Sequence, residues 1–211
     1  MLVPAIKICG ISTPETLDAA IAARADYFGL MFYAKSPRFV TLDQAAGLAS
    51  QAGSRIARVG VFVDPDDAQL RDAITAGRLD AVQLHRVTAA RRAEVQARFG
   101  LPVWAVLELA EGRDLRALDH YECFDRLIYD AKTPMNALPG GMGIRFDWTL
   151  LLNAPHPGPW GLAGGLSPAN VAEAVRITGA PLVDVSSGVE TAPGIKDPAL
   201  IAAFCAAARG A

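Results

Sequence analysis

A cysteine and an aspartate carry the strongest chemical signal in the sequence. Cys9 ends the short apolar run Ala5–Cys9, and Asp130 interrupts an apolar run much later in the chain. A thiol acts as a base only in its thiolate form, and because its ordinary pKa is about 8.5 this requires positive charge nearby. Lys7 points to the same side as Cys9 if this run is a strand. With a ligand between them, Cys9 and Asp130 have the arrangement of a paired general acid and general base.

Each of these residues also has a structural interpretation. A buried cysteine often behaves as a small hydrophobe, and Asp130 can pair with Lys132 or with a loop amide. His85 is a rival base because its ordinary pKa suits neutral pH, although a histidine at a strand end is as readily satisfied by backbone groups. The catalytic pair therefore depends on where the fold places these residues.

A second set of residues is suited to binding an anionic ligand. Arg38 can hold a carboxylate through two parallel hydrogen bonds, or it is a solvated loop charge. Gly164 and Gly165 follow the seventh apolar run, and a Ser-Ser-Gly sequence follows the eighth. Such glycines let backbone N–H groups approach a phosphate, or they simply form tight turns. The further candidate substrate-binding residues are Gln83, Asp184, Ser186, Ser187 and Gly188.

Eight short apolar runs recur along the 211 residues, about 26 residues apart on average. Runs that are apolar on both faces are typical of buried parallel strands. The stretches between them suit helices, and three carry start signals: Thr13 with Pro14, Ser167 with Pro168, and Asp197 with Pro198. The predicted strands are Ala5–Cys9, Tyr27–Phe32, Arg58–Val63, Ala81–Leu84, Val103–Leu107, Leu127–Tyr129, Gly161–Ala163 and Leu182–Val185.

This alternation predicts an α/β fold, a (β/α)8 TIM barrel formed by a single domain, residues 1–211, with short loops. A doubly wound open sheet is the alternative, but eight near-equal units favour a closed barrel. Barrel enzymes build their sites at the C-terminal ends of the strands, where the polar candidates fall, and often bind phosphate after strands seven and eight. The Gly- and Pro-rich stretch Lys132–Arg145 is predicted to be a mobile active-site loop.

Composition narrows the function classes. The net charge of −2 gives no sign of nucleic-acid or anionic-membrane binding. The N-terminus does not resemble a signal peptide, and the apolar run Ala199–Ala208 is too short to span a bilayer, so we expect a soluble cytoplasmic protein. Three scattered cysteines favour a reducing compartment, and three histidines without ligand spacing argue against zinc. Either a monomer or a homodimer fits.

A series of motifs, spread over the chain from end to end, resembles the phosphoribosylanthranilate isomerase family of tryptophan biosynthesis. One such motif alone is weak, but together, and in the family's order, they are specific. The motifs are Lys7–Ile11, Gly29–Tyr33, Lys35–Arg38, Val59–Val63, Val82–His85, Asp130–Pro134, Gly140–Gly143, Phe146–Trp148, Gly164–Val171 and Asp184–Glu190, followed by Gly194 and Lys196–Asp197.

The resemblance implies an Amadori rearrangement of a phosphosugar without metal or other cofactor. By the family's pattern, Asp130 is the general acid that protonates the furanose ring oxygen, and Cys9 is the general base that removes the C2 proton. Arg38 then holds the anthranilate carboxylate, and the loops at Gly164–Gly165 and Ser187–Gly188 hold the phosphate. Four positions depart from the expected pattern without touching Cys9 or Asp130: Arg86, Met142, Ile144 and Ala163.

Two other functions stay open at this point. A histidine-pathway isomerase uses the same barrel, but normally with two catalytic carboxylates and two similar halves, whereas here the first strand ends in Cys9. Acceptance of both substrates is a variant of this alternative. A non-catalytic phosphoribosyl-binding subunit is the other, and the presence of both Cys9 and Asp130 argues against it.

Overall fold

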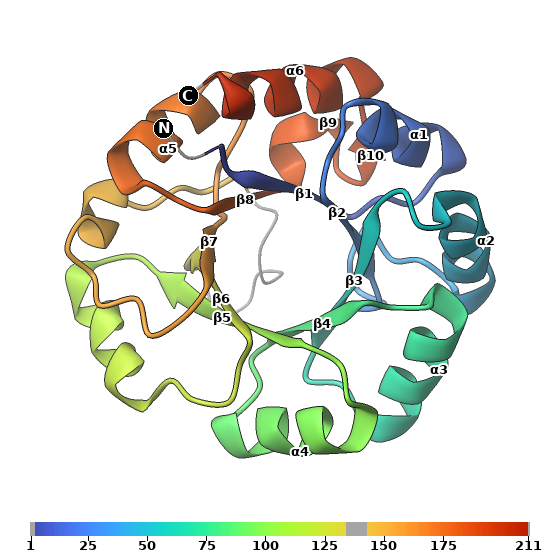
Figure 1. Ribbon diagram of the computed structural model, residues 1–211, viewed down its shortest axis with the longest axis horizontal. Helices are drawn as coiled ribbons and strands as arrows, with labels where there is room; N and C mark the ends of the chain where they lie inside the picture. The colour runs from blue at the N-terminus through green and yellow to red at the C-terminus, as the bar shows by residue number, and fades with distance from the viewer. Residues whose placement is uncertain (1–2, 134–142, 211) are drawn as a thin grey trace.

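The computed structural model describes residues 3–133 and 143–210. Eight parallel strands pair in sequence order, and β1 pairs with β8, so the sheet closes into a barrel. Figure 1 looks along this ring of strands and shows the helices around its outside. The strands are β1 (Ala5–Cys9), β2 (Tyr27–Met31), β3 (Ala57–Val63), β4 (Ala81–His85), β5 (Val103–Leu109), β6 (Arg126–Ala131), β7 (Trp160–Leu162) and β8 (Leu182–Val185).

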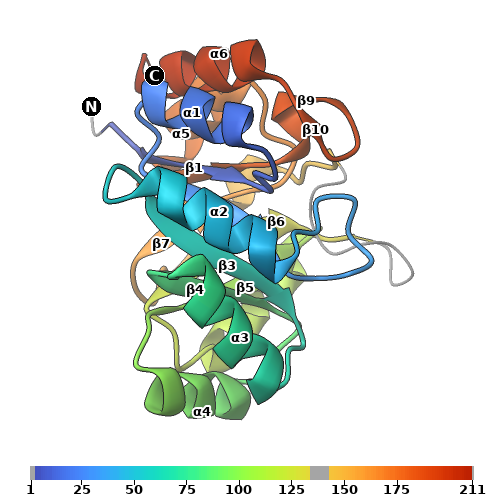
Figure 2. The same ribbon diagram turned by 90° about the vertical axis from the view of Figure 1, so that its right-hand side faces the viewer.

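The predicted closed barrel is therefore confirmed, and the predicted strands differ from the observed ones by at most two residues at an end. The α-helices of the described chain are α1 (Pro14–Ala22), α2 (Leu42–Ala52), α3 (Asp67–Gly77), α4 (Ala89–Phe99), α5 (Val171–Thr178) and α6 (Pro198–Arg209). Figure 2 shows α1, α2 and α3 following one another across the barrel wall. Within residues 3–133 and 143–210, no helix is both long and apolar enough to cross a membrane.

Side chains cap most of these helices at their first turn. The Thr13 hydroxyl accepts a hydrogen bond from the Thr16 N–H before α1, and Asp197 accepts from two N–H groups before α6, as the sequence predicts. The predicted start at Ser167 is wrong. Helix α5 begins only at Val171, after a turn in which the Asn170 Oδ1 accepts from the Ser167 N–H at 2.8 Å and the Ser167 carbonyl oxygen accepts from the Val171 N–H at 3.0 Å.

The β5–β6 and β6–β7 connections depart from the regular strand–helix unit. In their described residues, these connections contain 3-10 helices in place of α-helices: η1 (Gly112–His120) and η2 (Trp148–Leu151). The chain after η2 carries prolines at alternate positions from Pro155 to Pro159, which lack the N–H that a helix requires. His156 from this segment stacks on Trp160 with ring centroids 4.1 Å apart and covers Tyr129 of β6 in place of a helix.

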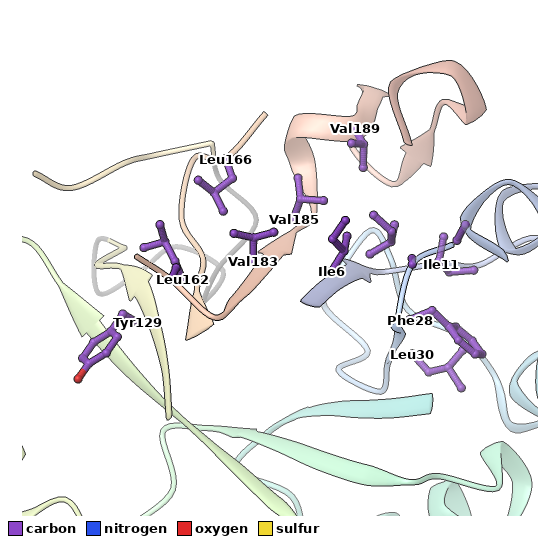
Figure 3. Close-up of a cluster of buried hydrophobic side chains, with 14 of the residues drawn as sticks. Ile6, Ile11, Phe28, Leu30, Tyr129, Leu162, Leu166, Val183, Val185 and Val189 are labelled. Carbon is purple, nitrogen blue, oxygen red and sulfur yellow. The ribbon is translucent and has the colours of Figure 1, made fainter. Parts of the chain in front are cut away.

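Two apolar layers hold the barrel together. The outer layer joins the outward side chains of the strands to the helices, and Figure 3 shows part of it, including Ile6 of β1, Phe28 of β2 and Val183 of β8. A smaller inner cluster, which includes Val59 and Trp104, fills the interior. The interior is therefore a packed core that can support a site at one end, rather than an open channel.

Candidate active site

A cavity with about 770 Å³ of empty space, part of it open solvent, lies at the C-terminal ends of the strands. Ten of the eleven predicted site residues line it. The exception is Gly188, where a Cβ atom would collide with the carbonyl oxygen of Leu166, so this glycine serves close packing of the loop. The ten residues are Cys9, Arg38, Gln83, His85, Asp130, Gly164, Gly165, Asp184, Ser186 and Ser187.

Asp130 has the properties of a general acid. It lies near the end of β6, it is only 7% exposed, and its Oδ1 accepts a hydrogen bond from the Ala131 N–H at 2.8 Å. Burial, reinforced by the nearby Asp184 carboxylate, raises the pKa of Asp130 to about 7. A carboxyl group with this pKa retains its proton in a large fraction of molecules at neutral pH, which an acid catalyst requires.

Cys9 and Lys7 point together into the barrel from β1. A Cβ atom on Gly29 of the neighbouring strand would lie 2.9 Å from the Cys9 Sγ and 3.3 Å from the Lys7 Nζ, so this glycine provides the space that both groups occupy. Burial raises the pKa of the Cys9 thiol, whereas the Lys7 ammonium opposes that rise. The predicted proximity of a positive charge is thus present in the structure.

Lys7 is itself fully buried and forms an ion pair with Asp184, with 2.7 Å between Nζ and Oδ2. The two residues are directly opposite each other in the β1–β8 register. Although burial alone lowers the pKa of Lys7, Asp184 raises it above its usual value, so the lysine stays charged. The other carboxylate oxygen of Asp184 is buried with no hydrogen-bond partner among the described residues.

His85 is a poor candidate for the base. Its burial, together with the charge of Lys7, lowers its pKa to about 3. An imidazole with that pKa is neutral and a weak base in the ordinary working range. Its Nε2 lies 3.3 Å from the Nε2 of Gln83, so the two side chains orient each other on β4.

Unpartnered polar atoms gather in the cavity. Buried polar groups usually have hydrogen-bond partners, so each exception requires an explanation. Among the described residues, four of the five buried side-chain atoms without a partner belong to residues that line the cavity. A polar ligand in the cavity would supply the missing partners. The four atoms are Gln83 Oε1, His85 Nδ1, Thr133 Oγ1 and Asp184 Oδ1.

Arg38 is buried rather than solvated, at 6% exposure, and Glu190 holds it. The Arg38 Nε and Nη2 atoms donate to the two Glu190 carboxylate oxygens at 2.7 and 2.8 Å. The bidentate pairing predicted for a ligand carboxylate is therefore made with Glu190 along this edge of the guanidinium. Glu190 begins β9 (Glu190–Ala192), which pairs with β10 (Ile195–Lys196).

Lys196 connects this ion pair to the loop after β8. Its Nζ donates to Glu190 Oε1 at 2.6 Å and to the Ser186 carbonyl oxygen at 3.0 Å. The sequence alone did not indicate roles for Glu190 and Lys196, whose only signal was their presence in the motifs that resemble the family. Thr133 was indicated only as part of the predicted active-site loop, Lys132–Arg145.

The glycines after β7 form tight turns and also leave backbone N–H groups available for a phosphate. Gly164 and Gly165 have positive φ values of 84° and 65°, and a Cβ on Gly164 would lie 2.5 Å from the Ala131 nitrogen, so tight turns are required here. Neither N–H group donates a hydrogen bond to another described residue. The same geometry therefore leaves donors available to an anion at the cavity wall.

Three of the four sequence departures lie in the described part of the chain. Arg86 has a φ of 58°, in the left-handed region that glycine adopts more readily than other residues. Ala163 and Ile144 line the cavity. Met142 and most of the predicted active-site loop, residues 134–142, lie outside the described residues.

The closed parallel barrel defines a protein of the TIM-barrel class, and its cavity brings together a carboxyl group, a cysteine and a lysine that are suited to acid–base chemistry. The model of the N-(5'-phosphoribosyl)anthranilate isomerase family matches residues 6–207. The chain belongs to this family.

Curated relatives and solved structures agree with this assignment. The chain is 52% identical over 208 residues to the N-(5'-phosphoribosyl)anthranilate isomerase of Paramagnetospirillum magneticum, with 97% of each chain covered. It is 54% identical to that of a Ruegeria species, again with 97% of each covered. The crystal structure of the Thermotoga maritima isomerase matches with a TM-score of 0.88 and 32% identity, covering 99% of this chain and 100% of that one.

A phosphoribosylanthranilate isomerase has also been solved with a ligand. This isomerase is in complex with reduced 1-(o-carboxyphenylamino)-1-deoxyribulose 5-phosphate. It matches this chain with a TM-score of 0.86 and 30% identity, covering 99% of this chain and 100% of that one.

Proposed function

We propose that this chain is the isomerase that converts N-(5-phosphoribosyl)anthranilate to 1-(2-carboxyphenylamino)-1-deoxyribulose 5-phosphate in tryptophan biosynthesis. The observation that carries the proposal is that Asp130, with its pKa raised to about 7, and Cys9 line one cavity in a chain of this family. The reaction needs both an acid and a base and moves a hydrogen within the substrate, so the residues supply all the chemistry by proton transfer.

Asp130 acts first. Its carboxyl proton passes to the furanose ring oxygen as the bond between that oxygen and C1 breaks, and the anilino nitrogen lone pair forms a C1=N double bond. The product of this step is a protonated Schiff base. Asp130 suits the step because its environment keeps the neutral acid available near neutral pH.

Cys9 acts second. Its thiolate takes the C2 proton, forming an S–H bond, while the C–H electron pair becomes a C1=C2 double bond and the C1=N pair returns to nitrogen. The positive iminium makes that C–H bond acidic, so a modest base is sufficient. The resulting enolamine tautomerises to the ketone.

The remaining cavity residues bind the substrate in this proposal. Arg38, positioned by Glu190, attracts the anthranilate carboxylate. The loops at Gly164–Gly165 and at Ser186–Ser187 bind the phosphate, close to the positive charge of Lys196. The unpartnered atoms of Gln83, His85 and Asp184 bind the sugar hydroxyl groups.

Further properties belong to the same proposal. Residues 1–211 work as one domain, because the barrel and its helices take in both described segments. The enzyme works in the cytoplasm on a small phosphosugar, without nucleic acid, membrane or cofactor, as a monomer or homodimer. A Thermotoga maritima relative is a dimeric phosphoribosylanthranilate isomerase that has been solved as monomers. Turnover of freshly generated phosphoribosylanthranilate by the purified chain tests the proposal.

A further inference from the structure

Four charged or reactive side chains follow one another around the barrel wall. Asp130 lies on β6, Asp184 on β8, and Lys7 and Cys9 on β1, and the strand order runs β6–β7–β8–β1. Asp184 is therefore the member of the Lys7–Asp184 ion pair that lies on the side of Asp130. Lys7 lies on the strand of Cys9, two residues away and facing the same side.

We propose that the buried Lys7–Asp184 ion pair biases the two catalytic groups toward opposite protonation states, its negative end favouring the neutral acid at Asp130 and its positive end favouring the thiolate at Cys9. Lys7 and Asp184 act in this through Asp130 and Cys9, so they are positioning residues. The inference rests on the proposed function only for the roles of acid and base.

The electrostatics of the two groups agree with this order. Apart from burial, the charge of Asp184 is the largest influence on Asp130 and raises its pKa, whereas the opposite effect of Lys7 is smaller. At Cys9 the order is reversed, because Lys7 has the larger effect and lowers the thiol pKa. One ion pair thus shifts the pKa values of the two groups in opposite directions.

Other charged side chains also shift the pKa values of Cys9 and Asp130. At Cys9, Lys196 on β10 acts in the same direction as Lys7. At Asp130, Glu108 acts in the same direction as Asp184 and pairs with Asp130 in the β5–β6 register. Among the described residues, further charged or titratable groups near the cavity are Tyr33 and Arg38 after β2, His85 and Arg86 at the end of β4, and Glu190 on β9.

Stability alone is a weak reason for this ion pair. Removing two charges from water costs several kcal/mol per ion, and replacing a buried pair by apolar side chains is often neutral or stabilising. Lys7 is fully buried, and one Asp184 oxygen has no hydrogen-bond partner among the described residues. The pair is therefore costly for the fold. Its negative end lies on the side of Asp130 and its positive end lies beside Cys9, and this orientation provides a functional reason for the pair.

The test measures Cys9 directly in the free protein. Iodoacetamide alkylates the thiolate, and peptide-resolved mass spectrometry across pH 6–10 separates Cys9 from Cys123 and Cys205. Lys7→Met should raise the thiol pKa, and Asp184→Asn should lower it. Each shift of one pKa unit changes the alkylation rate about tenfold below the pKa, and we expect at least this change in each direction.

Asp130 provides the second readout. The carboxyl carbon signal of Asp130, identified by its loss in Asp130→Asn, should titrate at lower pH in Asp184→Asn and not at lower pH in Lys7→Met. The control is Asp80→Asn, which breaks the 2.8 Å Arg58–Asp80 ion pair away from the cavity and should change neither titration.

Opposite shifts of Cys9 in the two variants support the proposal, because general loosening of the site would move both in one direction. Equal shifts, or none, overturn it. Asparagine has nearly the same shape as aspartate. The lowering of the Cys9 pKa in Asp184→Asn therefore tests the proposal by itself, even if Lys7→Met does not fold. Alkylation needs no turnover, so an inactive wild-type chain with these shifts would contradict the proposed function while leaving the ion-pair effect in place.

Discussion

Asp130 on β6 and Cys9 on β1 line one cavity, with β7 and β8 between their strands in the barrel order. A substrate in the cavity therefore contacts the two groups from different parts of the wall. This arrangement allows one residue to protonate the ring oxygen of a sugar and another to remove its C2 proton, as an acid–base isomerisation requires. The account depends on this relationship more than on any single pKa.

Replacing Asp130 by asparagine should reduce turnover by at least about a hundredfold, since general acid catalysis typically contributes this much or more. Because the pKa of Asp130 in the folded protein, about 7, lies above its ordinary value, the contribution of this residue to stability is greatest below the unfolded pKa and is lost as the pH rises toward 7. In urea unfolding at pH 5 and pH 8, the free energy of unfolding of the variant should increase relative to that of the wild type at the higher pH. An unchanged difference would contradict the raised pKa.

The pH profile of kcat/KM should rise up to about pH 7 and then level off. Below pH 7 Asp130 is already protonated, so each unit of increasing pH only adds thiolate at Cys9. Above pH 7 the loss of protonated Asp130 offsets that gain, until the thiol itself titrates at its raised pKa. Steady-state assays from pH 5 to 10 check this. A steady fall starting at pH 7 would mean instead that the thiol titrates below Asp130.

Replacing Glu190 by glutamine should raise KM about tenfold or more and lower kcat less. Although burial opposes it, Arg38 and Lys196 hold the pKa of Glu190 at about 2, so it is charged throughout the working range. Glutamine cannot accept the charge-assisted bidentate bond, and Arg38 loses its orientation. Arg38→Ala should show the same split between KM and kcat. If either variant lowers kcat alone, the carboxylate-binding role is wrong.

Two glycines with positive φ offer a matched pair of alanine substitutions. At Gly179 no atom lies near an added Cβ, so alanine should cost only about 1 kcal/mol of backbone strain. At Gly164 the Cβ also meets the Ala131 backbone 2.5 Å away and disturbs the cavity wall. Gly164→Ala should therefore lose more stability and also raise KM, as thermal unfolding and kinetics can show. Equal behaviour of the two variants would argue against phosphate binding at Gly164.

The barrel could be predicted from the sequence because its strands are apolar on both faces and recur at regular intervals. The wall at Tyr129 could not be predicted, because there the chain covers the barrel with the stacked His156 and Trp160 instead of a helix. Capping was predicted correctly at Asp197 but not at Ser167, where a turn comes first and the helix begins at Val171.

The candidate site was predictable to the extent that it follows strand ends. Cys9, His85 and Asp130 end or adjoin strands, so their meeting at one cavity follows from a closed barrel. Glu190 and Lys196 lie beyond β8 on a short hairpin, and only the folded structure shows that they hold Arg38 and the Ser186 carbonyl. Long-range charge pairs of this kind leave no periodic signal in a sequence.

The most direct test of the catalytic assignment is turnover of freshly generated phosphoribosylanthranilate, followed by the loss of its fluorescence. Purified wild type should be compared with Cys9→Ala and with the control Cys123→Ala, whose side chain does not line the cavity. We predict turnover by the wild type and the control, and none by a folded Cys9→Ala variant. Near wild-type activity in Cys9→Ala would contradict the catalytic base, and an inactive wild type would contradict the proposed reaction itself.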